Sequence, residues 1–111
     1  MSVTLVTTQA RLETTCPPWC GANHTAPFAA REEQLYGERV HWRRIDEIRD
    51  ADGLILAEVS VVRRDGLADG TTGRVLVGAN ADELLDGDQV AQFCAMARRA
   101  AAFAEEANRA I

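Results

Sequence analysis

The chain lacks lysine and has few aromatic residues. All 12 basic residues are arginine, and Phe, Tyr and Trp make up 5% of the 111 residues. We read no function into the missing lysine, because arginine-only usage is typical of a GC-rich genome. Hydrophobic residues still reach 47%, with alanine and valine in place of aromatics, so the composition is that of a globular protein and excludes a disordered one.

Long apolar runs are also missing. No stretch approaches the roughly 18 residues that a membrane span needs, and nothing at the N-terminus resembles a secretory signal. We therefore expect a soluble, cytoplasmic protein in which a reducing environment keeps cysteines as thiols. The formal net charge of −5 disfavours a general attraction to nucleic acid or anionic lipid.

The sequence contains no familiar catalytic motif. It has no G-x-S-x-G, and no histidine is placed in sequence to activate a metal-free thiol. The glycine-rich segment 66–73 precedes no helix, which makes it a poor phosphate cradle. The acidic pairs Asp82-Glu83 and Glu105-Glu106 fall at solvated positions by pattern. We expect no enzymatic activity.

Potential metal ligands are concentrated near the N-terminus. Cys16, Cys20 and His24 lie within nine residues, and His41 completes the pattern C-x3-C-x3-H-x16-H. Thiolates and imidazoles are the usual ligands of structural zinc, which binds four of them in a tetrahedron. The sequence therefore predicts a structural Zn²⁺ site, closed to substrate because the protein supplies all four ligands.

The residues between the two cysteines support this prediction. Pro17 and Pro18 fix the backbone and prevent an ordinary helix, so that a stiff knuckle brings the ligands to one side of a turn. Trp19 can cover the ion and limit the access of solvent.

Other uses of these cysteines remain open. Cys16 and Cys20 could form a disulfide, although a reducing cytosol would keep both thiols reduced. They could also form a redox-active pair, although such pairs are more often C-x-x-C. An iron–sulfur cluster would require more cysteines than this segment has. The third cysteine, Cys94, is predicted to be a small core residue, with a role as alternative fourth zinc ligand left open.

The segment Cys16-Pro17-Pro18-Trp19-Cys20 followed by His24, with a second histidine, a few strands and an alanine-rich C-terminal helix, resembles a family of small actinobacterial, Streptomyces-type proteins grouped as a domain of unknown function. The resemblance extends over most of the chain, and its specific part is Cys-Pro-x-Trp-Cys-x3-His. It implies a zinc knuckle and a cytosolic setting, and it supplies no reaction.

The whole chain is expected to form one α+β domain, residues 1–111. We predict an N-terminal strand and zinc knuckle in 1–41, a β-meander in 42–80 and a helix in 86–110 packed on the sheet. The strands are expected at Val3–Thr8, Val40–Ile48, Leu54–Val62 and Arg74–Ala79, the first of them optional, which gives three to four antiparallel strands.

The connections between these strands differ in how clearly they can be predicted. Asp50-Ala51-Asp52-Gly53 has the composition of a hairpin turn, and a bulge near Arg43-Arg44 would bring Val40, Trp42 and Ile45 to one face. Residues 24–40 are predicted to be a loop, because Pro27 and Gly37 would break a helix.

The C-terminal helix is the clearest element. Asp86 and Gln89 form a capping box that starts a helix at Gly87, which continues to Arg109. At 100° per residue, an apolar face points to the sheet; its members are Val90, Phe93, Cys94, Ala97, Ala100, Ala101 and Ala104. Met96 and Phe103 fall on its shoulder. We expect this shoulder to make the protein a homodimer.

Two functional classes follow. The first is a zinc-stapled module that binds another protein, either a second copy or a regulatory partner. The alternative is a nucleic-acid-binding regulator with an arginine patch on the sheet, made of Arg43, Arg44, Arg63, Arg64 and Arg74. The net negative charge favours the interaction module.

Overall fold

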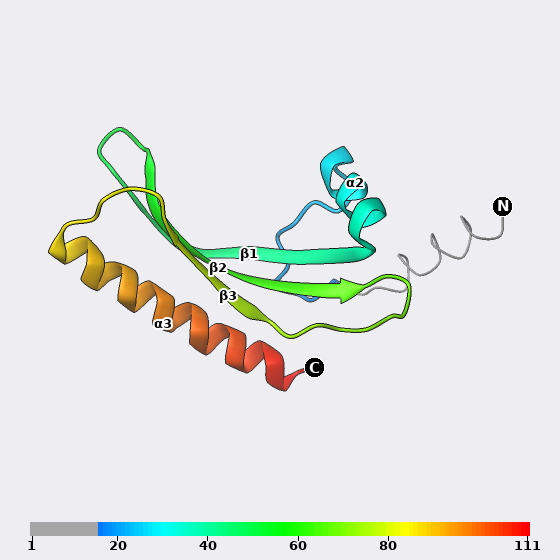
Figure 1. Ribbon diagram of the computed structural model, residues 1–111. Helices are drawn as coiled ribbons and strands as arrows, with labels where there is room; N and C mark the ends of the chain where they lie inside the picture. Colours follow the sequence, from blue (N-terminus) through cyan, green and yellow to red (C-terminus); the bar gives the residue numbers. More distant parts are fainter. Residues whose placement is uncertain (1–15) are drawn as a thin grey trace. The chain divides into compact units, whose positions relative to one another are not determined.

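The computed structural model describes residues 16–111 as two helices and a three-stranded sheet (Figure 1). In chain order these are α2 Pro27–Tyr36, β1 Glu38–Arg49, β2 Ile55–Gly66, β3 Leu76–Ala81 and α3 Gly87–Arg109. The sheet is an antiparallel meander in the order β1-β2-β3, and α3 packs on β3. The predicted α+β architecture is thus confirmed. The strand predicted at Val3–Thr8 lies outside the described residues.

By its internal contacts the chain divides into two compact units, and β1 and β2 contribute to both. Among the described residues, unit 1 comprises 16–42 and 63–74. Unit 2 comprises residues 43–62 and 75–111. A single domain over the whole chain stays a prediction.

The hairpin turn between β1 and β2 is confirmed. The Asp50 carboxylate accepts hydrogen bonds from the backbone N–H groups of Asp52 and Leu54, both at 2.9 Å. Gly53 has φ 88°, a left-handed conformation that costs glycine little. The side chain of Asp50 therefore replaces water at the backbone groups that the turn leaves unpaired.

The inward face of β2 is made of alternate residues. Ala57, Val59 and Val61 are at most 2% exposed, because alternate residues of a strand point to the same side of the sheet. The third strand begins two residues later than expected, at Leu76, and Val77 is 38% exposed. Since β3 is an edge strand, alternation alone does not bury its apolar residues.

Val75, just before β3, is buried and tied to the end of α3. Its N–H donates to Oδ1 of Asn108 at 2.7 Å, and its carbonyl accepts from Nδ2 of Asn108 at 3.0 Å. One asparagine side chain thus satisfies both backbone groups of Val75, as a neighbouring strand would do.

The capping box that starts α3 is confirmed. The Asp86 carboxylate accepts from the N–H of Gln89 at 2.8 Å, and the Gln89 side chain accepts from the N–H of Asp86 at 2.9 Å. The helix then runs from Gly87 to Arg109, as predicted.

The predicted buried face of α3 is partly wrong. The buried residues are Met96, Ala100 and Ala104, whereas Cys94 is exposed and Val90 is 47% exposed. The buried face is rotated around the helix axis relative to the predicted one. Its largest member is Met96, which is 0% exposed and whose long side chain fills the space next to the sheet. Phe103 is half-buried on the same side, with the Arg43 guanidinium 5.8 Å from the centre of its ring. Cys94 is therefore not the core residue that periodicity suggested.

The burial of Met96 reduces the apolar surface that the shoulder of α3 can offer to a partner, and the homodimer through α3 stays a prediction. Met96 was expected in water, but it lies in the core of unit 2 together with Val59 and Val61, which are also 0% exposed. A partner cannot reach a residue that the protein's own sheet already covers.

The prediction of a loop in residues 24–40 is wrong, since α2 spans Pro27–Tyr36. Pro27 lies in the first turn, where proline has no N–H to lose, and Gly37 ends the helix with φ 66° while its N–H donates to the carbonyl of Glu33. Both residues therefore act as helix boundaries. Glu33 is buried and forms an ion pair with Nε of Arg39 at 2.7 Å.

No helix within residues 16–111 combines the length and the apolar character needed to cross a lipid bilayer.

Replacing Met96 by Ala tests the corrected face of α3. We expect a loss of about 2–5 kcal/mol in the free energy of unfolding, because the substitution leaves a cavity in a packed core. Urea denaturation followed by circular dichroism measures this loss. The control is Leu84→Ala, since Leu84 is 98% exposed and should contribute almost nothing. Equal effects of the two substitutions would contradict the assignment.

Candidate metal centre

The two cysteines are brought together by a tight turn. The N–H of Cys20 donates to the carbonyl of Pro17 at 3.0 Å, and Pro18 occupies the second position of this turn, where its fixed φ is favourable. The N–H of Gly21 then donates to the carbonyl of Trp42 at 2.8 Å. This bond attaches the knuckle to β1, next to His41.

A second local turn positions His24. Oδ1 of Asn23 accepts from the N–H of Thr25 at 3.1 Å and from its hydroxyl at 2.6 Å, so the Asn23 side chain spans the backbone of His24. Helix α2 begins at Pro27, directly after this turn.

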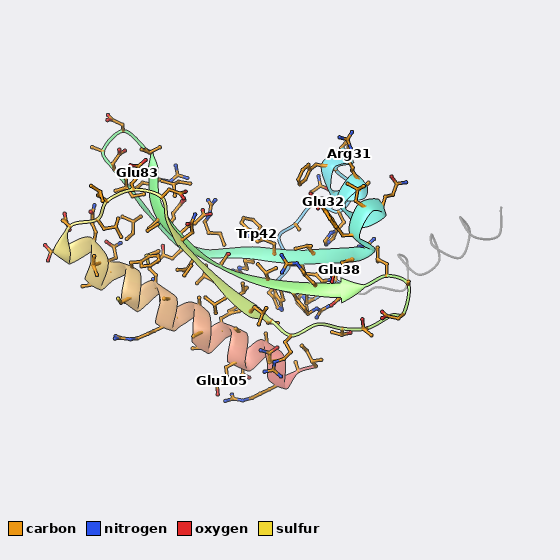
Figure 2. All side chains as sticks on the ribbon, viewed as in Figure 1. Arg31, Glu32, Glu38, Trp42, Glu83 and Glu105 are labelled. Atoms are coloured by element: carbon orange, nitrogen blue, oxygen red, sulfur yellow. The ribbon has the colours of Figure 1, made fainter. Side chains whose placement is uncertain are left out.

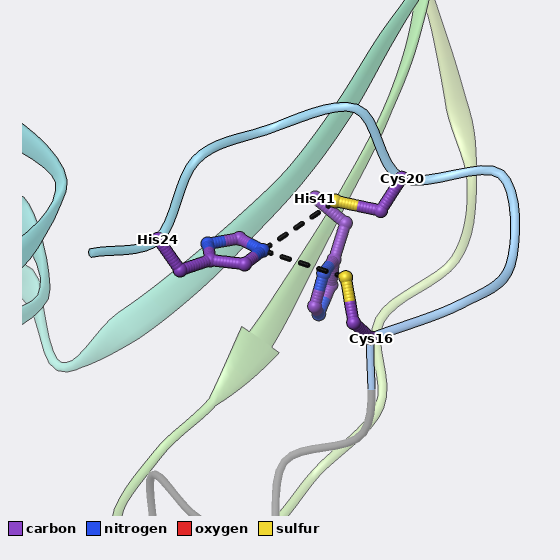
Figure 3. A group of neighbouring side chains, drawn as sticks. All are labelled: Cys16, Cys20, His24 and His41. Carbon is purple, nitrogen blue, oxygen red and sulfur yellow. Dashed lines mark hydrogen bonds between the residues drawn. The ribbon is translucent and has the colours of Figure 1, made fainter. Parts of the chain in front are cut away.

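Cys16, Cys20, His24 and His41 converge in unit 1 and are positioned to hold a metal ion (Figure 3). One ligand atom from each residue lies within 4.8 Å of the other three. Nε2 of His24 is 3.4 Å from the sulfur of Cys20 and 3.6 Å from that of Cys16. A tetrahedral zinc with ordinary bond lengths separates sulfur and nitrogen ligands by about 3.6 Å.

Hydrogen bonds alone cannot satisfy Nε2 of His24 and the two cysteine sulfurs at the same time. A neutral imidazole nitrogen carries either one N–H or one lone pair, so Nε2 of His24 can bond well to one of its two sulfur neighbours. A cation bound to both sulfurs and to Nε2 would satisfy all three atoms.

His41, on β1, is 0% exposed and is held by Asp65 of β2. Nε2 of His41 is 2.8 Å from Oδ2 of Asp65, whereas its Nδ1 is buried without a hydrogen-bond partner in the described structure. Since the ionised carboxylate is an acceptor, Nε2 carries the hydrogen and Nδ1 has the free lone pair. Nδ1 is therefore the atom of His41 that is available to a metal.

Asp65 is in turn fixed by Arg63 and Gly73. Nε of Arg63 donates to Oδ1 of Asp65 at 2.9 Å and a terminal guanidinium nitrogen to Oδ2 at 2.6 Å, while the N–H of Gly73 donates to Oδ1 at 3.1 Å. Burial opposes ionisation of this carboxyl, but the hydrogen bonds and the charge of Arg63 leave the pKa of Asp65 below its ordinary value. Asp65 is thus an ionised, fully occupied acceptor.

Both imidazoles are disposed to be neutral. Burial lowers the pKa of His24, and the charge of Arg39 lowers it further. Burial also lowers the pKa of His41 and outweighs the opposing effect of Asp65. Loss of water contacts and the nearby Cys20 raise the pKa of Cys16 to about 11, so in the metal-free protein a proton must leave this thiol before it can ligate.

Gly73 is required by close packing. A Cβ at this position would overlap the carbonyl oxygen of Arg64. Only glycine allows the end of segment 66–73 to come near enough to β2 for its N–H to reach Asp65.

The structure brings together all four residues that spacing predicted as ligands. Cys16 and Cys20 are free thiols, and Cys94 lies on α3 outside the cluster. The sequence analysis missed Asp65 and Arg63. Strand alternation could have revealed them, since both continue the inward parity of Ala57, Val59 and Val61.

The arginines predicted to form a nucleic-acid patch are partly engaged within the protein. In unit 1, Arg63 is bound to Asp65, while Arg64 and Arg74 are exposed. In unit 2, Arg44 pairs with Glu47 at 3.1 Å and with Glu58 at 2.9 Å. Arginines whose charge is already balanced attract phosphate weakly.

Comparison with models of protein families, with curated proteins and with solved structures finds no match to this chain.

Substitution of Gly73 by Ala tests the support of Asp65. We expect the free energy of unfolding to fall by about 1–3 kcal/mol, because the added methyl group forces β2 and segment 66–73 apart. Chemical denaturation is the measurement. Gly21→Ala is the matched control, since its Cβ would lie 3.6 Å from the carbonyl oxygen of Trp42, an ordinary contact. A stable Gly73→Ala protein would show that this close approach is not needed.

Proposed function

We propose that the protein is a small, zinc-stapled interaction module without catalytic activity, an adaptor or regulator that associates with itself. Zn²⁺ would be held by the sulfurs of Cys16 and Cys20, Nε2 of His24 and Nδ1 of His41. The observation that carries this proposal is the convergence of the four ligand atoms within 4.8 Å, where Nδ1 of His41 is buried and has no hydrogen-bond partner among residues 16–111.

The donor set favours zinc over other metals. Two sulfurs and two nitrogens in a compact cluster fit tetrahedral zinc, whereas magnesium and calcium prefer oxygen ligands. Two thiolates would balance the charge of Zn²⁺, and Arg63 balances Asp65 behind His41. The metal with its thiolates and the Asp65–Arg63 pair would each be neutral, which avoids the cost of burying net charge.

The interior of unit 1 supports a structural role for the metal. Within residues 16–42 and 63–74, Leu67 is the one buried apolar side chain, while Glu33, His41 and Asp65 are buried and polar. A segment with so little apolar burial gains little from the hydrophobic effect. Metal bonds would supply the missing stabilisation. Because the protein provides four ligands, no coordination position is left for a substrate.

Binding to a protein partner fits the surface better than binding to nucleic acid. The chain carries a net charge of −5, and Arg44 and Arg63 are already paired with carboxylates. Phe28, Leu35 and Tyr36 on α2 are each at least 67% exposed. Exposed apolar groups of this size are typical of protein contact surfaces.

Metal analysis tests the proposal directly. Protein purified without chelator should carry about one zinc per chain by native mass spectrometry, and Cys16→Ala or His41→Ala should lose both the metal and the fold of unit 1, since structural zinc supplies on the order of 10 kcal/mol. Cys94→Ala is the control and should keep its zinc. A metal-free wild type that is stably folded would overturn the proposal, as would an obligatory Cys16–Cys20 disulfide.

Asp65→Asn tests the orientation of His41. The neutral amide accepts the His41 N–H weakly and no longer balances Arg63, so zinc affinity should fall about 10- to 100-fold. Competition with a chromophoric chelator measures the change. Asp69→Asn is the control, because Asp69 is exposed in segment 66–73 and its carboxylate accepts hydrogen bonds from Thr71 instead of from His41. Unchanged affinity in Asp65→Asn would show that the carboxylate does not position the ligand.

A further inference from the structure

The candidate metal centre has an exposed side and a buried side. Among its four residues Cys16 is exposed, Cys20 and His24 are half-buried, and His41 is buried. The buried side is also the rigid one, because Nε2 of His41 is held by Asp65 at 2.8 Å. A small molecule from solvent therefore reaches Cys16 before it reaches the other three residues.

The two cysteines are close enough in space to react with each other. Their sulfur atoms lie within 4.8 Å of one another, and Figure 3 shows both directed at Nε2 of His24. The turn between them is closed by the hydrogen bond from the N–H of Cys20 to the carbonyl of Pro17. Since the sulfurs of a disulfide are about 2 Å apart, a shift of less than about 3 Å within this turn would bring them into bonding distance.

We propose that Cys16 and Cys20 are a thiol switch for the metal centre, in which a hydroperoxide oxidises the two thiolates to a disulfide and zinc is released. This inference adds a mode of regulation to the proposed function and rests on it, because a switch of this kind needs the bound metal. Both cysteines have already lost their protons in the metal-bound form, and the thiolate is the form that reacts with peroxides.

The oxidation has two steps. First, the sulfur of Cys16 attacks one oxygen of the hydroperoxide; an S–O bond forms, the O–O bond breaks, and the leaving alkoxide or hydroxide takes a proton from water. Next, the sulfur of Cys20 attacks the sulfur of this sulfenic acid; the S–S bond forms, and the departing hydroxide takes a second proton. The two sulfurs lose two electrons and the hydroperoxide gains them. The products are the disulfide, one water and one alcohol, or two waters from hydrogen peroxide.

The disulfide removes two of the four ligands. It leaves only His24 and His41, and two imidazoles do not complete the four-ligand shell of structural zinc. Within residues 16–42 and 63–74, Leu67 is the one buried apolar side chain. Loss of the ion therefore removes the stabilisation on which unit 1 would depend, and a disulfide that closes so short a loop replaces little of it.

The structural change should be confined to unit 1. The knuckle is attached to β1 by the N–H of Gly21, which donates to the carbonyl of Trp42, and Figure 2 shows Trp42 on that strand. Helix α2 begins three residues after His24. In contrast, unit 2 has an apolar core that contains Val59 and Met96, both 0% exposed, and holds no ligand of the metal centre. Oxidation should open the knuckle and α2 while α3 stays folded.

The test is titration of the full-length, zinc-loaded protein with hydrogen peroxide. A chromophoric chelator should detect the release of about one zinc per chain. Peptide mass spectrometry should find a Cys16–Cys20 disulfide, with a mass about 2 Da lower than that of the reduced peptide. Amide hydrogen exchange in α2 should become about tenfold faster or more, whereas exchange in α3 should not change. Dithiothreitol with added zinc should reverse all three effects.

Two variants locate the reaction. Cys94→Ala is the control, because Cys94 is exposed but lies outside the cluster, and it should release zinc as the wild type does. Cys16→His keeps four ligands but cannot form the disulfide, so it should retain zinc at peroxide concentrations that empty the wild type. The disulfide found in the wild type gives the same assignment without a change of ligand.

Four results for a zinc-loaded wild type would overturn the switch while leaving the metal site intact. They are zinc that stays bound under peroxide, zinc release without a Cys16–Cys20 bond, a disulfide that includes Cys94, and hydrogen exchange in α2 that does not change. A reduced protein that folds without zinc would overturn the metal site itself, and the switch with it. Zinc content is therefore measured on the reduced sample before peroxide is added.

Discussion

The hydrogen bond between His41 and Asp65 is the contact on which the arrangement of the candidate metal centre depends. It joins two strands across 24 residues of sequence and lets a buried imidazole lie beside a buried carboxylate at 2.8 Å. Without its partners, a carboxylate in this position would be strongly destabilising. The same bond decides which nitrogen of His41 remains free, so the ligand geometry follows from the pairing of β1 with β2.

The interior of each unit is stabilised by a different kind of interaction. Unit 2 has an apolar core in which Val59 and Val61 from the sheet and Met96 from α3 are fully buried. In the described part of unit 1, Glu33, His41 and Asp65 are buried instead, and each is stabilised by a specific partner. Apolar burial tolerates changes of shape better than a network of paired charges does. We therefore expect unit 1 to be the more sensitive of the two to single substitutions at its ligands and their partners.

Helix α2 connects this network to the surface. Its inner side is fixed by the ion pair between Glu33 and Arg39, and Arg39 also lowers the pKa of His24. Because an ion pair occupies the inner side of the helix, its large apolar residues lie on the outer, exposed side. The proposed metal site and the exposed apolar residues of α2 thus share one short segment, in which the turn that carries His24 is followed directly by the helix.

The sequence by itself determined those features that depend on near neighbours. The capping box of Asp86 and Gln89, the turn at Asp50 and the ligand spacing of Cys16, Cys20 and His24 all act over a few residues, so their side chains find the same partners in any fold. The boundaries of α2 at Pro27 and Gly37 are local as well, and the sequence analysis misread these two residues as helix breakers. Tertiary structure decided the rest: the role of Asp65 and the side of α3 that Met96 buries. These depend on contacts with residues far away in the chain, which local propensity and periodicity do not encode.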